Sequence, residues 1–217
     1  MHQQVVKLRK FEWYLPIVGV KEGTLKNDIL ALIETSRGLE LGRIVTLPKG
    51  SGKKTTKEIR LRKIIRYATT EDQARLAELE VKEADTVALA NRKSKEHELP
   101  IRVVAAEYLF DESRILLYYR VDEGKKNFIL KGFIKDMVGN LKAKVDLTQL
   151  SARDEARLMS GIGPCGRVIC CASYLERPLH ITVKRVKELG LQISPTKTSG
   201  VCGKLFCCLQ YEDKEKK

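Results

Sequence analysis

The spacing of apolar and polar residues predicts a mixed fold in which a small β unit precedes an α/β layer. The strand-like runs of the first part cover residues 28–34, 39–47 and 59–67. In the last run, Ile59, Leu61 and Ile65 are expected to face inward, and the Gly/Lys stretch 49–54 before it reads as a loop. Residues 1–69 are therefore predicted to form a small basic β unit that resembles a barrel.

A long helix and then a sandwich of helices and strands are predicted for residues 70–150. Thr70 opens a Thr-Glu-Asp-Gln sequence that is typical of a helix start, and a helix is expected from there to about Glu98. Its apolar residues at helical spacing are Ala77, Val81, Ala84 and Ala88. The elements expected next are strands at 101–110, 115–121 and 142–149, and a helix with Ile129, Phe133 and Met137 on one face. This order is typical of a ferredoxin-like α/β sandwich, so the predicted fold class is α+β.

The composition adds a strong positive charge to this picture. The 217 residues carry 41 Lys and Arg against 28 Asp and Glu, a net charge of +13 that favours polyanionic partners. Basic residues concentrate in the β unit, and the candidate contacts to RNA or to an acidic partner are Lys49, Lys53, Lys54, Lys57, Arg60 and Arg62. The alternative interpretation is a solvated hairpin loop.

The sequence indicates a cytoplasmic protein. Its longest apolar runs, such as 29–33, are far shorter than the roughly 20 residues that a membrane-spanning helix needs. The first residues lack the apolar core and the cleavage site of a signal peptide. In a reducing compartment, structural disulfides are not expected.

All six cysteines lie close together and form an internal repeat. Cys-Gly-Arg-Val-Ile-Cys-Cys begins at position 165, and Cys-Gly-Lys-Leu-Phe-Cys-Cys begins at position 202, a spacing of 37 residues. Clustered cysteines in a cytosolic chain indicate metal or redox chemistry. The candidate ligands are Cys165, Cys170, Cys171, Cys202, Cys207 and Cys208. Residues 151–217 are therefore predicted to be a cysteine-rich region that binds a metal or a cluster.

The residues between the cysteines suit a thiolate site. Gly166 and Gly203 let the backbone bend close to a bulky centre and present N–H groups to sulfur. Arg167 and Lys204 are expected to favour the thiolate, which is the form that binds metal. The apolar pair in each copy can anchor the loop and shield the site from water.

The number of cysteines leaves several ligand sets open. Six thiols exceed one four-cysteine site and fall short of two, and neighbouring cysteines in an extended strand would point to opposite faces. Either one four-thiolate site forms across the repeats, or two incomplete sites each take a ligand from another subunit, from solvent or from His180. An iron–sulfur cluster, with four iron and four sulfide ions favoured, suits such a set. Structural zinc, redox thiols and inert core cysteines are the alternatives.

No arrangement in the sequence is typical of a catalytic site. Asp154 and Glu155 are adjacent in a helix that Ser151 is expected to cap, so they point in different directions and make a poor acid/base pair. We therefore expect a protein that is not an enzyme. A thiol redox enzyme is the alternative on this point.

Several short motifs match one known family. They are Arg153-Asp154-Glu155-Ala156, Gly161-Ile162-Gly163-Pro164-Cys165-Gly166-Arg167, Cys170-Cys171, Cys202-Gly203-Lys204-Leu205 and Cys207-Cys208-Leu209. On these residues the chain resembles the bacterial YaaT/RicT family, stage-zero-sporulation-type regulatory proteins that share the polymerase-suppressor C-terminal domain. The resemblance covers nearly the whole chain and is most specific over residues 151–212.

The resemblance implies a non-enzymatic regulatory subunit. Family members in spore formers join two small helical regulatory proteins in a complex that carries iron–sulfur clusters, and the ligands here would come from the six cysteines. That complex acts with endoribonuclease Y in mRNA processing and influences sporulation, competence and biofilm formation. A nucleic-acid-binding module that zinc stabilises is the alternative.

Overall fold

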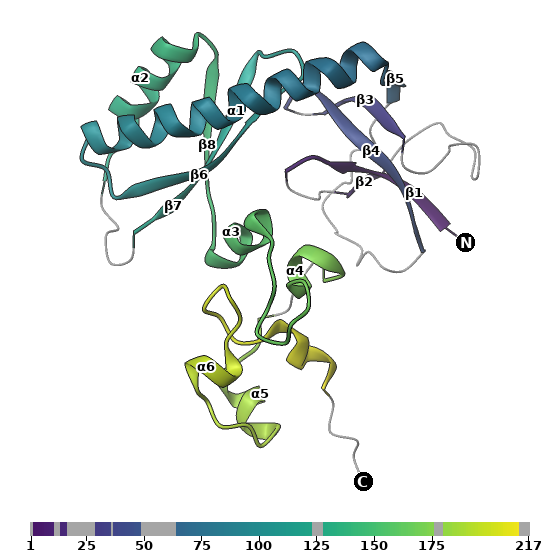
Figure 1. Cartoon of the computed structure of the whole chain (residues 1–217), viewed down its shortest axis with the longest axis vertical. Helices are drawn as coiled ribbons and strands as arrows, with labels where there is room; N and C mark the ends of the chain where they lie inside the picture. Colours follow the sequence, from purple (N-terminus) through teal and green to yellow (C-terminus); the bar gives the residue numbers. More distant parts are fainter. Residues whose placement is uncertain are drawn as a thin grey trace. The chain divides into compact units, whose positions relative to one another are not determined.

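The chain folds into two compact units. The structure is a computed structural model that describes residues 2–10, 14–16, 29–35, 37–48, 64–122, 128–175 and 180–212. Unit 1 comprises residues 1–148 and unit 2 comprises residues 149–217. Sheets and long helices lie in unit 1, and short helices and turns make up unit 2, so the α+β class is confirmed (Figure 1). The finer division at residues 69 and 150 stays a prediction.

The first sheet of unit 1 is open. Its strands are β1 (His2–Leu8), β2 (Tyr14–Pro16), β3 (Leu30–Glu34), β4 (Leu39–Pro48) and β5 (Ile64–Tyr67), in the order β2-β1-β4-β3-β5. A barrel closes only when its first and last strands pair, and in the described part of the chain β2 and β5 are the two edges. The predicted barrel-like shape is therefore wrong, and the sheet instead buries one face around Val6, Ile33 and Ile44.

In strand β5 the residue that faces inward is Ile64, whereas the sequence predicts its neighbour Ile65. Ile64 packs against the core of the first sheet, whereas Ile65 is 49% exposed. The pairing of β3 with β5 shifts register between Leu32 and Ile33, and a shift of one residue exchanges the two faces of a strand. The prediction for Ile65 is therefore wrong. Ile59, Leu61 and the loop 49–54 lie outside the described residues.

The second sheet of unit 1 carries the larger core. Its elements are α1 (Thr70–Glu96), β6 (Ile101–Tyr108), β7 (Arg114–Val121), α2 (Lys131–Leu141) and β8 (Lys144–Gln149), with the strand order β6-β7-β8. Leu79 of α1 and Phe133 and Met137 of α2 enter one core with Leu117 of β7, so both helices cover the same face of the sheet. The element order is as predicted. A ferredoxin-like sandwich has four strands, and the three described here leave that topology unconfirmed.

Helix α1 begins with a capping box at Thr69 rather than at Thr70. The Thr69 hydroxyl accepts the Asp72 N–H at 3.3 Å, and the Asp72 carboxylate accepts the Thr69 N–H at 2.8 Å. Arg66 of β5 donates to the same carboxylate. This ion pair ties Asp72 to the preceding strand and so selects Thr69 as the cap.

The buried face of α1 is partly polar. The apolar stripe Ala77, Val81, Ala84 and Ala88 is exposed, and Val81 is 65% exposed. The buried residues of the helix are Asp72, Leu79, Glu83, Thr86, Ala90 and Ser94. Polar side chains enter a core when they have partners, and the Thr86 hydroxyl lies 2.8 Å from that of Tyr108. The apolar spacing therefore predicts the helix correctly and does not mark its buried side.

Unit 2 consists of short elements around a small core. They are α3 (Ala152–Met159), α4 (Cys170–Ser173), α5 (Val183–Glu188), α6 (Pro195–Thr198) and the 3₁₀ helix η1 (Cys207–Tyr211). Ser151 caps α3 as predicted, in a capping box with Asp154. The core is built from Ile181, Val186 and Leu209. No helix among the described residues of either unit is both long enough and apolar enough to cross a bilayer.

Candidate functional site

Each copy of the cysteine repeat folds into a tight turn that leads into a short helix. Three backbone hydrogen bonds close the first turn, from the N–H of Gly163 to Arg167 (2.8 Å), of Gly166 to Gly163 (2.9 Å) and of Ile169 to Gly161 (3.1 Å). The second turn has the same three bonds 37 positions later, from Gly200 to Lys204, Gly203 to Gly200 and Phe206 to Thr198, each 2.9 Å. The sequence repeat is thus also a structural repeat.

The glycine after the first cysteine of each copy is required by the shape of the turn. Gly166 has φ +75° and Gly203 has φ +72°, in the left-handed region that costs other residues about 1–2 kcal/mol. A Cβ at either position would meet no atom within 4 Å, so the requirement is one of backbone conformation alone. These turns hold Cys165 and Cys202 at their tips.

The cysteines of each copy lie at two places, the turn and the start of the helix that follows it. Cys170 and Cys171 begin α4, and Cys207 and Cys208 begin η1. All six cysteines are free thiols. The expectation that neighbouring cysteines lie in an extended strand is wrong, because both pairs lie in helical turns. Adjacent residues in such a turn point roughly a third of a turn apart and not to opposite faces.

The two copies face each other inside unit 2, because α4 contacts η1. Thiols of one copy act electrostatically on thiols of the other, Cys202 on Cys171, and Cys170 followed by Cys165 on Cys208. The middle cysteine of the first copy, Cys170, acts on its counterpart Cys207. These influences run between the two copies of the repeat.

Burial and mutual repulsion both oppose ionisation of these thiols. Burial, followed by the neighbouring Cys170, raises the pKa of Cys207 to about 11. Burial also raises the pKa of Cys171 and of Cys208, with Cys202 and Cys170 respectively as the second cause. Metal ligation requires the thiolate, so a bound cation or cluster would offset the repulsion that the fold imposes here.

The donor set fits a thiophilic group in its chemistry. Thiolates are the ligands that zinc and iron–sulfur clusters take in proteins, and two facing triplets supply enough of them. In the part of the chain that the structure describes, no three His, Cys, Asp or Glu side chains converge closely enough to hold one metal ion. The thiols therefore lie on elements that contact each other, but the described residues do not surround a single metal position.

The other predicted site residues are placed as follows. Arg167 and Lys204 have exposed side chains, and the turns use their backbone carbonyls as acceptors. His180 is exposed just before the buried Ile181. The basic candidates Lys49, Lys53, Lys54, Lys57, Arg60 and Arg62 lie outside the described residues.

The sequence did not predict a contact between two tyrosines that lie beside the cysteines. Tyr174 and Tyr211 are 37 positions apart, and their ring centroids lie 6.4 Å apart. The Tyr174 hydroxyl donates a hydrogen bond to Cys170, which is the main reason that its pKa is raised to about 12. Following the 37-residue period beyond Cys208 would have found this pair.

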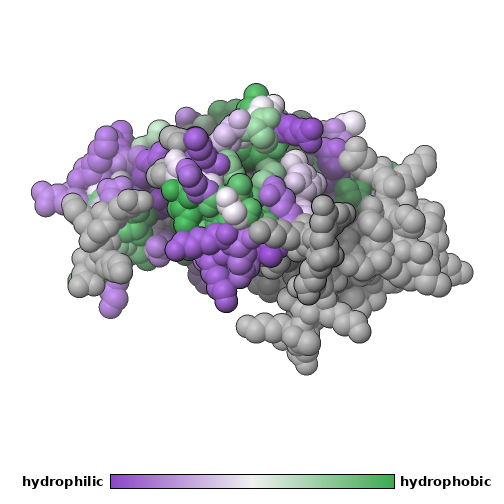
Figure 2. Space-filling model, turned by 90° about the horizontal axis from the view of Figure 1, so that it is seen from below, coloured by the Kyte–Doolittle hydropathy of each residue, from purple (hydrophilic) through white to green (hydrophobic). Residues whose placement is uncertain are grey.

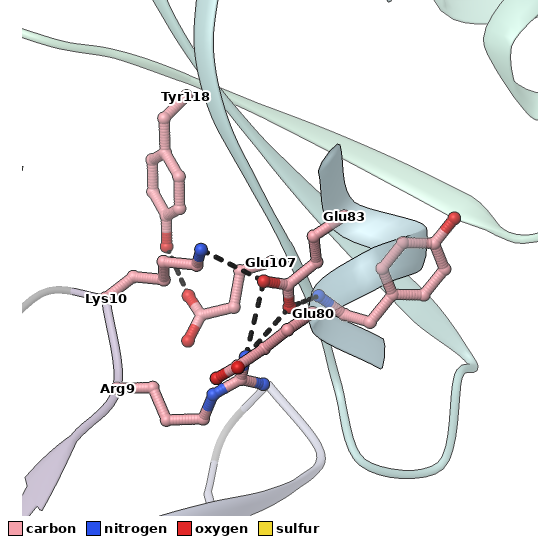
Figure 3. A network of polar contacts seen from close by, with 7 residues as sticks. Arg9, Lys10, Glu80, Glu83, Glu107 and Tyr118 are labelled. Carbon is pink, nitrogen blue, oxygen red and sulfur yellow. Dashed lines mark hydrogen bonds and ion pairs between the residues drawn. The ribbon is translucent and has the colours of Figure 1, made fainter. Parts of the chain in front are cut away.

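Unit 1 contains a separate buried polar network, which links β1 to α1 and β6 (Figure 3). The Glu83 carboxylate, on a residue only 2% exposed, accepts from Arg9 at 3.1 Å and pairs with Lys10 at 3.0 Å. Glu107 accepts from the Tyr118 hydroxyl at 2.7 Å, and burial raises the pKa of Glu107. Each carboxylate has partners within the protein, so we assign the network a structural role in holding these elements together.

Unit 2 also exposes many large apolar side chains for its size. They are Met159, Ile162, Val168, Tyr174, Val183, Leu191, Ile193, Val201 and Tyr211. In the surface view, apolar patches lie directly beside strongly polar ones (Figure 2). Exposed apolar groups on this scale are typical of protein–protein contact surfaces.

Comparisons with known proteins agree with the motif resemblance. Residues 62–150 match the PSP1 C-terminal conserved region, and residues 180–215 match the third domain of PSP1-like proteins. The stage 0 sporulation protein YaaT of Bacillus subtilis (strain 168) is 35% identical over 191 residues, which are 88% of this chain and 68% of the relative. No solved structure matches the chain significantly.

Proposed function

The chain belongs to the YaaT family of PSP1-domain proteins, and from this premise we propose that it is a non-enzymatic regulatory subunit that binds an iron–sulfur cluster. The observation that carries the proposal is the contact of α4 with η1, because Cys170 and Cys171 begin one of these helices and Cys207 and Cys208 begin the other. Thiolates drawn from both copies would ligate the cluster, with the four-iron four-sulfur form favoured.

Ligation would also hold unit 2 together. The hydrophobic clusters of this unit are small, and one of them has Ile181, Val186 and Leu209 as its buried residues. Small domains gain much of their stability from metal ligation, because ligand binding and folding are then coupled. A group bound between α4 and η1 would fix the two copies against each other. Its gain or loss would therefore change the surface that unit 2 offers to partners.

The proposed partners follow from the family and from this surface. Exposed apolar residues such as Ile162, Val168 and Val201 support a role as one subunit of a larger complex. We assign to that complex two small helical regulatory proteins in the cytoplasm, acting with endoribonuclease Y in mRNA processing. Sporulation, competence and biofilm formation are the proposed outputs, and the name of the Bacillus relative supports the first. RNA is a further candidate partner.

Anaerobic purification of the full chain with iron, sulfide and zinc analysis tests the proposal. We expect a brown protein with iron and sulfide, and we expect Cys170→Ser and Cys207→Ser to lose colour and partner binding together. Lys184→Ser introduces the same side chain at an exposed position of α5 without removing a thiol, and it should retain both.

Other results would point elsewhere. A colourless protein with stoichiometric zinc and salt-dependent binding to RNA alone indicates the nucleic-acid-binding alternative. Turnover with a dithiol partner indicates a thiol redox enzyme. Cysteine variants that keep full iron and full partner binding would overturn the ligand assignment.

A further inference from the structure

We propose that Arg153 and Arg157 form a fixed positive surface on α3 that compensates the negative charge of the cysteine cluster. The inference rests on the proposed function for the identity of the bound group. For the position of the two guanidinium groups it rests on the structure alone. Both are positioning residues that act through the thiols, since a guanidinium stays protonated at physiological pH and is a poor metal ligand.

Helix packing places α3, which carries the two arginines, beside the helix that begins with two of the cysteines. Helix α3 contacts α4, which begins with Cys170 and Cys171, and these helices lie next to each other (Figure 1). Residues four apart share one face of a helix, so Arg153 and Arg157 lie on the same side of α3. Both are half-buried, and the Nε atom of each is buried.

The positive charge reaches thiols of both copies. The positive charge of Arg153 acts electrostatically on both Cys171 and Cys207. Arg157 does the same at Cys171. Cys171 belongs to the first copy and Cys207 to the second, so the charge of Arg153 acts on both copies of the repeat.

Arginine suits this position for a physical reason. Its guanidinium stays charged at every physiological pH and is weakly hydrated, so it tolerates partial burial better than lysine does. The buried Nε of Arg153 has no hydrogen-bond partner in the protein. Asp154, its neighbour in the helix, is engaged by the Ser151 cap. A partly buried cation of this kind is best balanced by negative charge beside it, and the thiolates that would ligate a cluster supply such charge.

The first test reads the local potential in the metal-free full chain. The rate of thiol modification by the anionic 5,5′-dithiobis(2-nitrobenzoate) is divided by the rate with the neutral 4,4′-dithiodipyridine. The fraction of thiolate affects both rates and cancels in the ratio, which then reports the field at the thiols. We expect Arg153→Gln and Arg157→Gln to lower this ratio about two- to five-fold, and Arg153→Lys to restore most of it.

The second test uses the protein with its cluster. Because net charge near a cluster sets its reduction potential, Arg153→Gln should shift the midpoint potential to a more negative value. Lys184→Gln is the matched control, since it removes the same charge from an exposed lysine on α5 and should leave both readouts unchanged.

The outcomes separate the two proposals. If the wild-type chain holds no iron, the proposed function fails, and the reagent ratio still decides whether the arginines act on the thiols. If Arg153→Gln and Arg157→Gln both behave like Lys184→Gln in the reagent ratio while their circular dichroism is native, the arginine inference is overturned.

Discussion

Tyr174 and Tyr211 occupy equivalent positions in the two copies of the repeat, and their rings meet at a tilt of 37° with centroids 6.4 Å apart. This contact joins the copies beside the cysteines. Aromatic pairs at this separation attract each other beyond their buried area, and both rings here are more exposed than buried. The pair should therefore contribute a small but measurable coupling between the two halves of unit 2.

A double-mutant cycle with Tyr174→Leu and Tyr211→Leu measures this coupling. We expect an interaction free energy of about 0.5 kcal/mol, at the low end for aromatic pairs because solvent reaches both rings. Urea unfolding of the four proteins gives the value. Strictly additive effects of the two substitutions would show that the rings do not interact in solution.

The two turn glycines should respond alike to substitution. Gly166→Ala and Gly203→Ala each place a side chain in the left-handed region, so each should lower the free energy of unfolding by about 1–2 kcal/mol. Gly139→Ala in α2, where a Cβ would also meet no atom within 4 Å, should instead be neutral or stabilising. Urea unfolding compares the three. Clearly unequal costs at Gly166 and Gly203 would contradict the structural equivalence of the turns.

Glu83 should matter far more than Glu80, although both lie on α1 and pair with Arg9. Glu83→Gln removes a buried charge that faces Arg9 and Lys10, and we expect a loss of about 3 kcal/mol in unfolding free energy. The Glu80 side chain is 60% exposed and 3.5 Å from Arg9, so Glu80→Gln should cost less than about 0.5 kcal/mol. Similar losses of unfolding free energy for both variants in urea would show that the buried Glu83 ion pairs do not stabilise the fold.

Glu107 gives unit 1 a specific pH dependence. Burial holds its pKa above the unfolded value of about 4.3. Its contribution to stability is therefore complete below that pH and is lost as the pH rises through the folded-state pKa. Glu107→Gln keeps an acceptor for the Tyr118 hydroxyl and does not ionise. We thus expect this variant to become more stable relative to wild type as the pH rises.

Urea unfolding at intervals from about pH 4 to pH 8 measures this difference. Glu78→Gln, at an exposed position of α1, is the matched control and should show no such trend. A difference between Glu107→Gln and wild type that stays flat across the range would mean that Glu107 is not protonated more readily in the folded state.

Two adjacent threonines at the start of α1 should respond differently to substitution, although the sequence alone does not distinguish them. Thr69→Ala removes the hydroxyl that caps the Asp72 N–H and should cost about 1 kcal/mol. Thr70→Ala changes an exposed first helical residue and should be neutral within about 0.5 kcal/mol. Thermal unfolding ranks the two variants, and the reverse order would place the cap at Thr70.

The sequence by itself determined the features that depend on neighbouring residues. Ser151 and Asp154 form their capping box because residues three apart meet at a helix start. The cysteine repeat recurs as equal hydrogen bonds because equal local sequences make equal turns. Most strands and helices follow for the same reason, since their alternation and periodicity are local properties.

Only the tertiary structure decided what depends on partners distant in the chain. Glu83 is buried because Arg9, 74 positions away, neutralises it, and no pattern within α1 contains that information. The same holds for the open first sheet, whose edges are set by which strands pair. The influence of Cys170 on Cys207 likewise arises from the contact of α4 with η1, because these two residues begin those helices. The sequence repeat predicts that the thiols lie close together, and the packing of the helices determines which of them interact.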